Sequence, residues 1–559
     1  MTNGQGLDYN RLWSETDPWA SIPDRYNLGR ALTRGQVEAG LGDKVCLRWE
    51  NSAGETRSFT YRQMDEASSR LASALSRLGV RRGDRVLLRM PNLAEFYLAA
   101  LGIAKLGAVF IPSSTQFRAA EIAYRLRDSE AIAVITTTPL AGEVREALST
   151  APSVAHVISV AYGDVAHHDG ELDFWELLSG GDPLFESADT AHDDVAFIAY
   201  TSGTTGDPKG VVHYHRYPIS YDPLIAHWHD YQPHDVCACP AEVGWLLPVA
   251  STFLYSMRAG IETVLYHPID GRFRAEDWLR LFQKYGITNF TATPTIYRLL
   301  IASEHARREH FASLRHGVSA GEPLPPDTIS SVKKTMGFEP LDGIGMSECM
   351  VYCFNMLGLP QLPGSCGRPS PGTEIRLLDE QMQPVPPGSP GVLCLRRDSH
   401  PGMMKEYWRK PEQTAEIFRG EWYYSGDVLE QDDEGRYWFR ARADDVINAA
   451  GYRISPFEVE SCLAEHPSVL ESAAVESPDD VRGAVVKVFV VLRESIVADD
   501  DMRQTLAEWV KENLAPYKYP RRIEFVEALP KTTSGKIKRR LLRDQERQRY
   551  EEQRQSKAA

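Results

Sequence analysis

The chain has 559 residues, which at roughly 150 residues per domain allows about three or four domains or subdomains. Its 25% charged and 43% hydrophobic residues match a globular protein and exclude a collagen-like, coiled-coil or largely disordered chain. The 62 basic and 77 acidic residues give a formal net charge of −15, which opposes binding to nucleic acid over most of the surface.

The sequence carries no sign of a membrane or a secreted protein. No stretch of about 18 residues is free of charged and polar side chains, so we expect no membrane span. The segment MTNGQGLDYN has neither a basic cluster nor an apolar stretch, and we therefore expect a cytoplasmic location. The eight cysteines lack the spacing of a disulfide framework or a paired zinc motif, which predicts reduced thiols in packed positions.

The first predicted elements alternate between strands and helices. Thr60 and Gln63 form a capping box for a helix that Gly79 can close, and a second helix is expected at 94–106. Alternating elements of this kind predict an α/β fold with largely parallel sheets. The accompanying strands are expected at 86–90, 108–111, 131–136 and 195–200.

The residue pattern changes in the last third of the chain. Beyond about residue 370, Pro and Gly separate short alternating runs at 374–378 and 391–395, which predicts a β-rich subdomain. A last unit begins near Asp444, with helix-start signals at 455–458 and a strand at 485–492.

These patterns predict two domains. The large N-terminal domain, residues 1–443, is expected to hold two parallel-sheet α/β subdomains and the β-rich subdomain. The small C-terminal domain, residues 444–559, is expected to be α+β and mobile, and its charged tail after Lys536 favours a solvated helix over a binding arm.

The segment Tyr200-Thr-Ser-Gly-Thr-Thr-Gly-Asp-Pro-Lys-Gly210 carries the strongest chemical signal. Its glycines let main-chain N–H groups converge on an anion, while its hydroxyls and its lysine add donors and charge, so it suits a polyphosphate. It is not a Walker A loop, because Lys209 is followed by Gly210 rather than by Ser or Thr. A flexible surface turn is the alternative, although random turns seldom follow a strand with so many donors.

This segment resembles the phosphate-binding signature of the adenylate-forming superfamily, which contains acyl-CoA synthetases, luciferases and peptide-synthetase adenylation domains. Further segments follow in the family's order and span nearly the whole chain. They are AGEPL at 320–324, DGIGMSE at 342–348, YSGD at 424–427, RADD at 442–445, NAAGYRISPFEVE at 448–460 and PKTTSGK at 530–536. The DGIG run is similar to that of benzoate-CoA ligases, which points to the benzoate-type and medium-chain acyl-CoA synthetase branch.

The resemblance implies a two-step reaction with ATP, Mg²⁺ and coenzyme A. A substrate carboxylate attacks the α-phosphorus of ATP and expels pyrophosphate, and the thiol of coenzyme A then attacks the acyl-adenylate and releases AMP. Because two anions must meet in the first step, positive groups and a magnesium ion are needed to neutralise them.

The resemblance also implies a nucleotide site made of four groups of residues. The phosphates would contact Thr201, Ser202, Gly203, Thr204, Thr205, Gly206 and Lys209. The adenine would lie between Gly321, Glu322 and Pro323 on one face and Asp342, Gly343, Ile344 and Gly345 on the other, with Met346 and Ser347 following. Asp427 would bind the ribose hydroxyls, and Arg442 and Arg453 would contact phosphate or ribose.

Catalysis and metal binding are implied for a smaller set. Lys536 would bridge the attacking carboxylate and the α-phosphate, Arg442 would assist, and His215 would lie beside the acyl group, with a packed histidine as the alternative. Thr204 and Glu348 would hold magnesium, a hard ion that takes oxygen ligands.

A rotation of the small domain about Asp444 is implied between the two steps. It would bring in Lys536 for adenylation and then the loop that contacts coenzyme A, formed by Ala450, Gly451 and Tyr452.

Trp245, His215 and Gly345 are expected to border the acyl pocket, with a plain core tryptophan as the alternative at Trp245. Acetate-specific relatives have tryptophan at the place of Gly345, so the glycine is expected to leave room for an aromatic, a medium-chain or a small branched or hydroxylated acid.

Two functions stay open beside the acid:CoA ligase: an adenylation enzyme that passes the acyl group to a carrier protein or an amine, and a silent nucleotide-binding module. A homo-oligomer also stays open.

Overall fold

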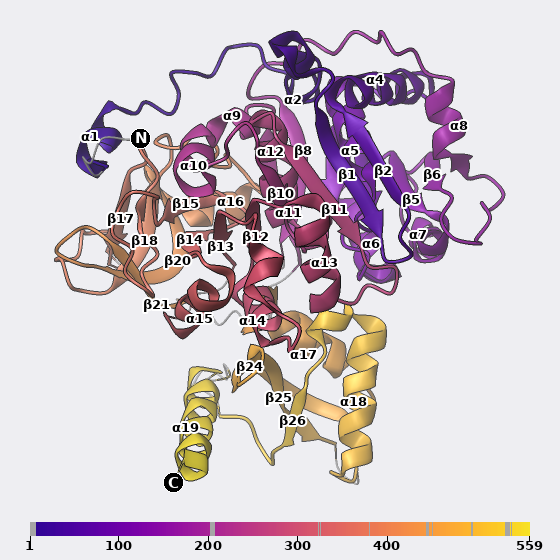
Figure 1. Ribbon diagram of the computed structural model, residues 1–559. Coiled ribbons are helices and arrows are strands. Elements are labelled where there is room, and N and C mark those ends of the chain that lie inside the picture. Colours follow the sequence, from indigo (N-terminus) through magenta and orange to yellow (C-terminus); the bar gives the residue numbers. More distant parts are fainter. Residues whose placement is uncertain are drawn as a thin grey trace. The chain divides into compact units, whose positions relative to one another are not determined.

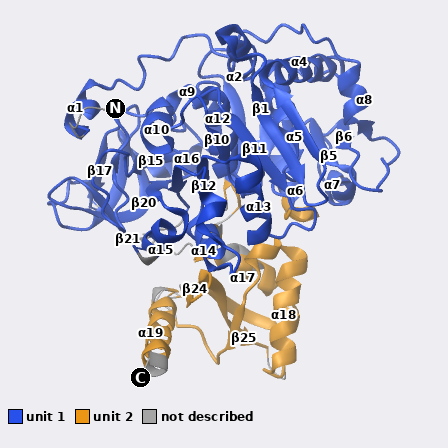
Figure 2. Ribbon diagram, viewed as in Figure 1, with its two compact units in different colours: residues 1–115, 122–200, 210–440 blue, residues 116–121, 201–209, 441–559 orange. Residues whose placement is uncertain are grey.

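The computed structural model describes residues 7–201, 207–321, 324, 326–379, 381–442, 447–449, 451–454, 456–493, 496–530, 537 and 539–558. The chain divides into two compact units, which Figure 2 shows in blue and orange. Unit 1 contains residues 1–115, 122–200 and 210–440, and unit 2 contains residues 116–121, 201–209 and 441–559. The predicted domain boundary at Asp444 lies outside the described residues and stays a prediction.

The first sheet has seven strands in the order β7-β6-β5-β3-β4-β8-β9. Its neighbours from β7 to β8 pair in parallel, as the alternating pattern predicted. The strands are β3 (Arg85–Arg89), β4 (Val109–Pro112), β5 (Ala133–Thr137), β6 (His156–Val160), β7 (Leu172–Asp173), β8 (Val195–Thr201) and β9 (Lys209–Tyr214).

Helices pack around this sheet (Figure 1). The predicted capping box is present, since the Thr60 hydroxyl accepts from the Gln63 N–H and the Gln63 side chain accepts from the Thr60 N–H. Gly79 follows this helix at φ 89°, a left-handed conformation that favours glycine. The helices are α4 (Tyr61–Arg77), α5 (Ala94–Lys105), α6 (Ala119–Ser129), α7 (Ala141–Leu148) and α8 (Phe174–Ser179).

The second sheet has nine strands in the order β16-β15-β14-β13-β12-β10-β11-β1-β2. The strands from β1 to β14 in this order pair in parallel, whereas β2, β15 and β16 pair antiparallel at the two ends. The strands are β1 (Val45–Asn51), β2 (Thr56–Thr60), β10 (Val236–Ala238), β11 (Glu262–His267), β12 (Asn289–Ala292), β13 (His316–Ser319), β14 (Leu341–Gly345), β15 (Val351–Phe354) and β16 (Arg368–Pro369).

Several helices and two π-helical turns accompany the second sheet. Those that matter for the site are η3 (Ile225–His229), η4 (Val249–Tyr255), α13 (Ala275–Tyr285), α14 (Pro294–Ala302) and α15 (Pro326–Met336). The shorter helices of unit 1 are α1 (Tyr9–Glu15), α2 (Leu28–Leu32), α3 (Arg34–Gln36), α9 (Tyr217–Ser220), α10 (Asp222–Leu224), α11 (Leu246–Pro248), α12 (Ser256–Arg258) and α16 (Pro411–Ile417).

The third sheet confirms the β-rich subdomain. Its described pairs are antiparallel, in the order β17-β18-β20-β19 with β21 beside β20. The strands are β17 (Ile375–Leu378), β18 (Gly391–Arg396), β19 (Phe418–Arg419), β20 (Trp422–Gln431) and β21 (Tyr437–Arg442).

Unit 2 contains the α+β arrangement expected of the last segment. Its main sheet has the order β24-β25-β26, and β22 pairs with β23. The elements are β22 (Ile447–Ala449), β23 (Tyr452–Ile454), α17 (Pro456–Ala464), β24 (Val469–Asp479), β25 (Gly483–Leu492), α18 (Asp500–Asn513), β26 (Arg522–Phe525) and α19 (Arg539–Ala558). The charged tail forms α19, as predicted, and it is anchored by Leu542 in the core and by an ion pair between Glu546 and Lys487.

Two further expectations concern the chain as a whole. All eight cysteines are buried thiols, as the spacing predicted. Across the described residues, we find no helix with the length and apolarity that crossing a membrane requires.

Candidate functional site

The predicted phosphate loop connects β8 to β9. Its central residues, Ser202, Gly203, Thr204, Thr205 and Gly206, lie outside the described residues. At its two ends, the Thr201 hydroxyl donates a hydrogen bond of 3.5 Å to the Lys209 carbonyl. The described contacts of the loop are therefore those of the residues that flank it.

The residue before the loop, Tyr200, is tied to α6. Its hydroxyl donates to Asp128 Oδ2 at 2.7 Å, and the other carboxylate oxygen of Asp128 lies 3.1 Å from the Lys410 ammonium. The Trp408 indole N–H donates to the Asp128 carbonyl at 3.2 Å. One aspartate thus joins the start of the phosphate loop to residues more than 200 positions later in the chain.

The residue after the loop, Gly210, has no room for a side chain. Its carbonyl accepts the Trp408 N–H at 2.7 Å. A Cβ atom on Gly210 would lie 2.8 Å from Ile198 Cγ2 and 3.2 Å from Trp408 Cβ, both closer than ordinary contact. Close packing of neighbouring side chains thus favours glycine as the last residue of the motif.

Asp342 joins the two segments that are expected to flank the adenine. Its buried carboxylate accepts the N–H of Leu324 at 3.3 Å and that of Gly343 at 3.0 Å. Its carbonyl accepts two N–H groups of Asn355, so the aspartate also fixes the β14–β15 hairpin. Burial raises the pKa of Asp342 to about 8, because the charged carboxylate is removed from water.

We expect Asp342 to make stability depend on pH. Because the folded-state pKa is raised, the neutral carboxyl stabilises the fold fully below its unfolded pKa, and this contribution is lost as pH rises through about 8. Asp342→Asn keeps a neutral side chain at all pH values. Between pH 6 and pH 9, the melting temperature of the natural protein should therefore fall further than that of this variant. Equal falls in melting temperature would contradict the raised pKa of Asp342.

Gly345 is closely packed, and its expected role in leaving an open pocket stays a prediction. A Cβ atom on Gly345 would lie 1.8 Å from the Met350 carbonyl oxygen and 2.5 Å from its carbon. The same carbonyl accepts the Met346 N–H at 3.1 Å, across the irregular register of β14 with β15. The main chain of the hairpin occupies the space beside Gly345, and this close approach explains the glycine.

Glu348 lies in the turn after β14 and is 9% exposed. Its carboxylate oxygen Oε1 accepts the Tyr407 hydroxyl at 2.6 Å, and its carbonyl accepts the Met404 N–H at 2.8 Å. Ser347, next to it, is partly exposed. A carboxylate fixed through one oxygen suits a hard cation such as magnesium at the other.

Asp427 lies on β20 and is 5% exposed. Its N–H donates to Ser425 Oγ at 3.0 Å, and the Ser425 hydroxyl donates to the Leu393 carbonyl, which ties this part of β20 to β18. Met346, Tyr352, Tyr407 and Tyr423 share one hydrophobic cluster, so the hairpin carrying Glu348 and the strand carrying Asp427 pack on a common core.

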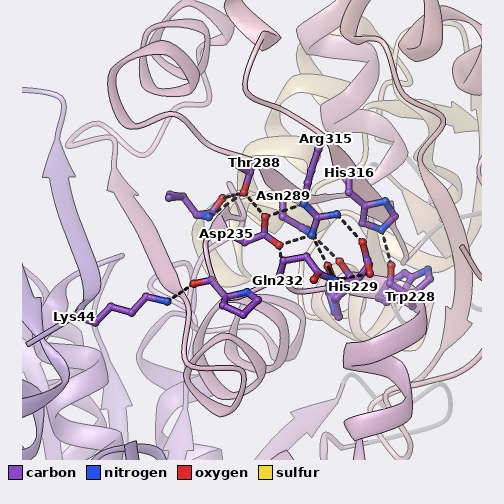
Figure 3. A network of polar contacts seen from close by, with 12 residues as sticks. Lys44, Trp228, His229, Gln232, Asp235, Thr288, Asn289, Arg315 and His316 are labelled. Atoms are coloured by element: carbon purple, nitrogen blue, oxygen red, sulfur yellow. Dashed lines mark hydrogen bonds and ion pairs between the residues drawn. The ribbon is translucent and has the colours of Figure 1, made fainter. Parts of the chain in front are cut away.

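A polar network surrounds the end of η3, which carries Trp228 (Figure 3). Arg315 forms ion pairs with Asp230, at 2.6 Å, and with the fully buried Asp235, and Asp230 adopts a left-handed φ of 48°. Asp235 also accepts the Thr288 hydroxyl at 2.7 Å. These contacts fix the end of η3 against β10, β12 and β13.

Trp228 itself contacts the predicted adenine strand. Its carbonyl accepts from His316 Nε2 at 2.6 Å, and its indole N–H donates to the Leu341 carbonyl at 3.2 Å. A Cβ atom on Gly343 would lie 3.2 Å from Trp228 Cε2, so this glycine allows the ring to approach. The sequence offered no signal for this support, because the residues involved are far apart in the chain.

His215 has the contacts of a packed histidine, the alternative left open by the sequence. It is fully buried, and its Nδ1 accepts the Leu28 N–H at 3.0 Å. Burial lowers its pKa to about 4, which keeps the ring neutral near pH 7. Its expected place beside the acyl group stays a prediction.

The loop before Trp245 is anchored to the end of β4. The Glu242 carboxylate accepts the Ser114 hydroxyl at 3.0 Å and the Thr115 N–H at 2.6 Å. A Cβ atom on Gly244 would lie 2.6 Å from Ser114 Cα, so the two loops touch through their main chains. Trp245 is partly exposed at the end of this anchored loop.

The remaining predicted residues belong to the 320–324 segment or to unit 2. Gly321 is exposed with φ 97°, Gly451 has φ 83°, and Tyr452 stacks on Tyr517 at 4.1 Å between ring centroids. The predictions for Glu322, Pro323, Asp444, Ala450 and Lys536, and for the side chains of Arg442 and Arg453, fall outside the described part of the chain.

Known proteins resemble the chain over almost its full length. Residues 35–408 match the family of the AMP-binding enzyme, and residues 458–536 match the AMP-binding enzyme C-terminal domain. An uncharacterized acyl-CoA ligase, YtcI, of Bacillus subtilis is 38% identical over 94% of this chain and 97% of its own. The human mitochondrial acyl-coenzyme A synthetase ACSM3 is 36% identical over 94% of this chain and 90% of its own.

Two solved structures have the same fold. The acyl-CoA synthetase of Brucella canis is 30% identical, with a TM-score of 0.72 over 97% of this chain and 100% of its own. The anthranilate CoA ligase AuaEII in complex with anthranoyl-AMP is also 30% identical, with a TM-score of 0.71 over 96% of this chain and 100% of its own. The chain thus belongs to the family of AMP-binding enzymes, as its motifs and the fold that carries them predicted.

Proposed function

We infer that the protein is an AMP-forming carboxylic acid:CoA ligase. The observation that supports this most directly is that unit 1 places Asp342, Glu348 and Asp427 around one core, with both flanks of the phosphate loop tied to the same unit. YtcI, ACSM3 and the Brucella canis protein, which match 94–97% of the chain, are named as acyl-CoA ligases or synthetases.

The reaction has two displacement steps. A carboxylate oxygen of the acid attacks the α-phosphorus of ATP, the bond from phosphorus to the bridging oxygen breaks, and pyrophosphate leaves. The sulfur of coenzyme A then attacks the acyl carbonyl carbon, and AMP leaves. ATP and coenzyme A are therefore the two common substrates.

The nucleotide would be held by the predicted residues of unit 1 and of the phosphate loop. Main-chain N–H groups of the loop and Lys209 would bind the phosphates, Asp427 would accept hydrogen bonds from the ribose, and the β14 segment would border the adenine. The fixed carboxylate of Glu348, with Thr204, suits a magnesium ion, which would neutralise charge on the phosphates when bound.

Residues of unit 2 would complete each step in turn. Lys536 would bring a positive charge between the carboxylate and the α-phosphate, with Arg442 and Arg453 as further contacts to the nucleotide. Rotation about Asp444 would then present Ala450, Gly451 and Tyr452 to coenzyme A.

The acid is proposed to be larger than acetate, and aromatic and medium-chain acids are the first candidates. The support is the resemblance of the DGIG run to benzoate-CoA ligases and the similarity to an anthranilate CoA ligase. Gly345 adds no support for a larger acid, because close main-chain packing already accounts for a glycine there. Trp245, on its anchored loop, is the side chain we propose at the acyl group.

Transfer of the acyl group to a carrier protein or an amine is not favoured, because the matched relatives are named for coenzyme A. A cytoplasmic location stays a prediction, and ACSM3 is named as mitochondrial.

The function predicts thioester formation from ATP and coenzyme A with a suitable acid. The protein is incubated with each of acetate, butyrate, hexanoate, benzoate and anthranilate, and the acyl-CoA is measured by mass spectrometry. We expect thioesters of the larger acids, together with AMP, and at least about tenfold less from acetate. Pyrophosphate release without any thioester would instead support a carrier-dependent adenylation enzyme, and ATP binding without turnover would support a silent module.

A further inference from the structure

Seven residues before α16 contact three separate parts of the proposed nucleotide site. This stretch, Met404 to Lys410, is called the bracing segment. All the contacts described below lie within unit 1. The segment carries none of the residues that the sequence singled out for chemistry.

The bracing segment holds both flanks of the phosphate loop. On the side before the loop, Lys410 and Trp408 both bind Asp128, which accepts the Tyr200 hydroxyl. On the side after the loop, the Trp408 N–H donates to the Gly210 carbonyl, and residues Val211 and Tyr407 pair as a short antiparallel bridge.

The same segment also holds Glu348. The Met404 N–H donates to the Glu348 carbonyl at 2.8 Å, and the Tyr407 hydroxyl donates to Glu348 Oε1 at 2.6 Å. Tyr407 is 4% exposed, and its main-chain N–H donates to Thr414 Oγ1 at 3.0 Å, so its main chain is held as well as its hydroxyl.

The backbone of the segment is bent where these contacts diverge. Arg409 has a φ of 53°, a left-handed conformation that costs a large side chain free energy, and its guanidinium pairs with Glu130. This bend lies between Trp408 and Lys410, which both bind Asp128.

We propose that Tyr407 is a positioning residue that orients Glu348 toward the magnesium ion of MgATP. By occupying Oε1, the Tyr407 hydroxyl fixes the rotation of the carboxylate and leaves Oε2 to face the ion. Hydrogen bonds of this kind to metal-binding carboxylates commonly matter about 10-fold to 100-fold for metal affinity. The inference rests on the proposed function, since it needs an ATP site that uses Glu348.

The test compares ATP binding with and without the metal. ATP is titrated by calorimetry into the natural protein and into Tyr407→Phe, once in excess magnesium chloride and once in EDTA. We expect the variant to bind ATP about tenfold more weakly with magnesium and equally well in EDTA. The magnesium concentration for half-maximal pyrophosphate release should rise by a similar factor, and excess magnesium should restore the rate.

Three further comparisons make the test specific. Tyr352→Phe is the matched control, because the buried Tyr352 hydroxyl has no hydrogen-bond partner among the described residues. This variant should bind ATP as tightly as the natural protein. In a Glu348→Gln background, Tyr407→Phe should cause no further weakening. Thr414→Val removes the acceptor of the Tyr407 main-chain N–H but keeps the Tyr407 hydroxyl on Glu348. This variant should lose less ATP affinity than Tyr407→Phe, again only with magnesium.

Each outcome decides the proposal. If Tyr407→Phe weakened ATP binding equally with magnesium and in EDTA, Tyr407 would be merely structural. If neither Tyr407→Phe nor Thr414→Val weakened ATP binding in either condition, Tyr407 would have no role in positioning Glu348. If the natural protein itself failed to bind ATP, the proposed function would fall. If it bound ATP in a magnesium-dependent way and Tyr407→Phe matched it, only this inference would fall.

Discussion

Lys536→Ala is expected to abolish formation of the acyl-adenylate while leaving the second step largely intact. In the proposed reaction, the lysine places a positive charge between the attacking carboxylate and the α-phosphate. Loss of one such preorganised group commonly costs about 10²–10³-fold in rate. Pyrophosphate release in the presence of the acid measures the first step, and thioester formation from a supplied acyl-adenylate measures the second.

The control for this variant is Lys538→Ala, which changes the net charge equally and lies two residues away. It should retain both steps. If Lys536→Ala slowed both steps by the same factor, the lysine would not act in adenylation alone, and the proposed division of work would be wrong.

Gly345→Ala is expected to impair adenylation of every acid alike. The new Cβ atom would lie 1.8 Å from the Met350 carbonyl oxygen, so the β14–β15 hairpin must shift by an ångström or more. This hairpin carries Asp342 on β14 and Glu348 in its turn. Since a displacement of about 1 Å in an active site can cost about 100-fold, we expect a loss of that order in kcat/KM for butyrate, hexanoate and benzoate.

Gly142→Ala is the matched control. A Cβ atom on Gly142 would meet no heavy atom within 4 Å, and the residue lies in α7, where alanine is the better helix former. The control should keep full activity. If Gly345→Ala instead lost only the larger acids and kept the smallest, the glycine would border an open acyl pocket, and main-chain packing would not explain it.

The local elements were predictable from the sequence because their signals are local. The capping box at Thr60 and Gln63 and the strand–helix–strand run over 85–112 were placed within one or two residues. The order of strands was not predictable. β1 lies between β11 and β2 in the second sheet, although more than 200 residues separate it from β11 in the chain, and no periodicity encodes that pairing.

The site was predictable in its motifs but not in its supports. The sequence named Asp342, Glu348 and Asp427 through their motifs, and the structure gathers the elements that carry them in unit 1. Tyr407 gave no signal, because an aromatic residue 59 positions from Glu348 in the chain has the pattern of an ordinary core residue. Gly345 was interpreted through its missing side chain, and the close approach of the Met350 carbonyl to it gave no signal in the sequence.

We expect this chain to use ATP to form an acyl-adenylate from a carboxylic acid. Exchange of labelled pyrophosphate into ATP tests it most directly, because exchange requires reversible formation of the adenylate and no coenzyme A. We predict exchange that depends on a carboxylic acid and on magnesium and that disappears in Lys536→Ala. Exchange without any acid, or release of ADP and phosphate in place of AMP and pyrophosphate, would contradict the account.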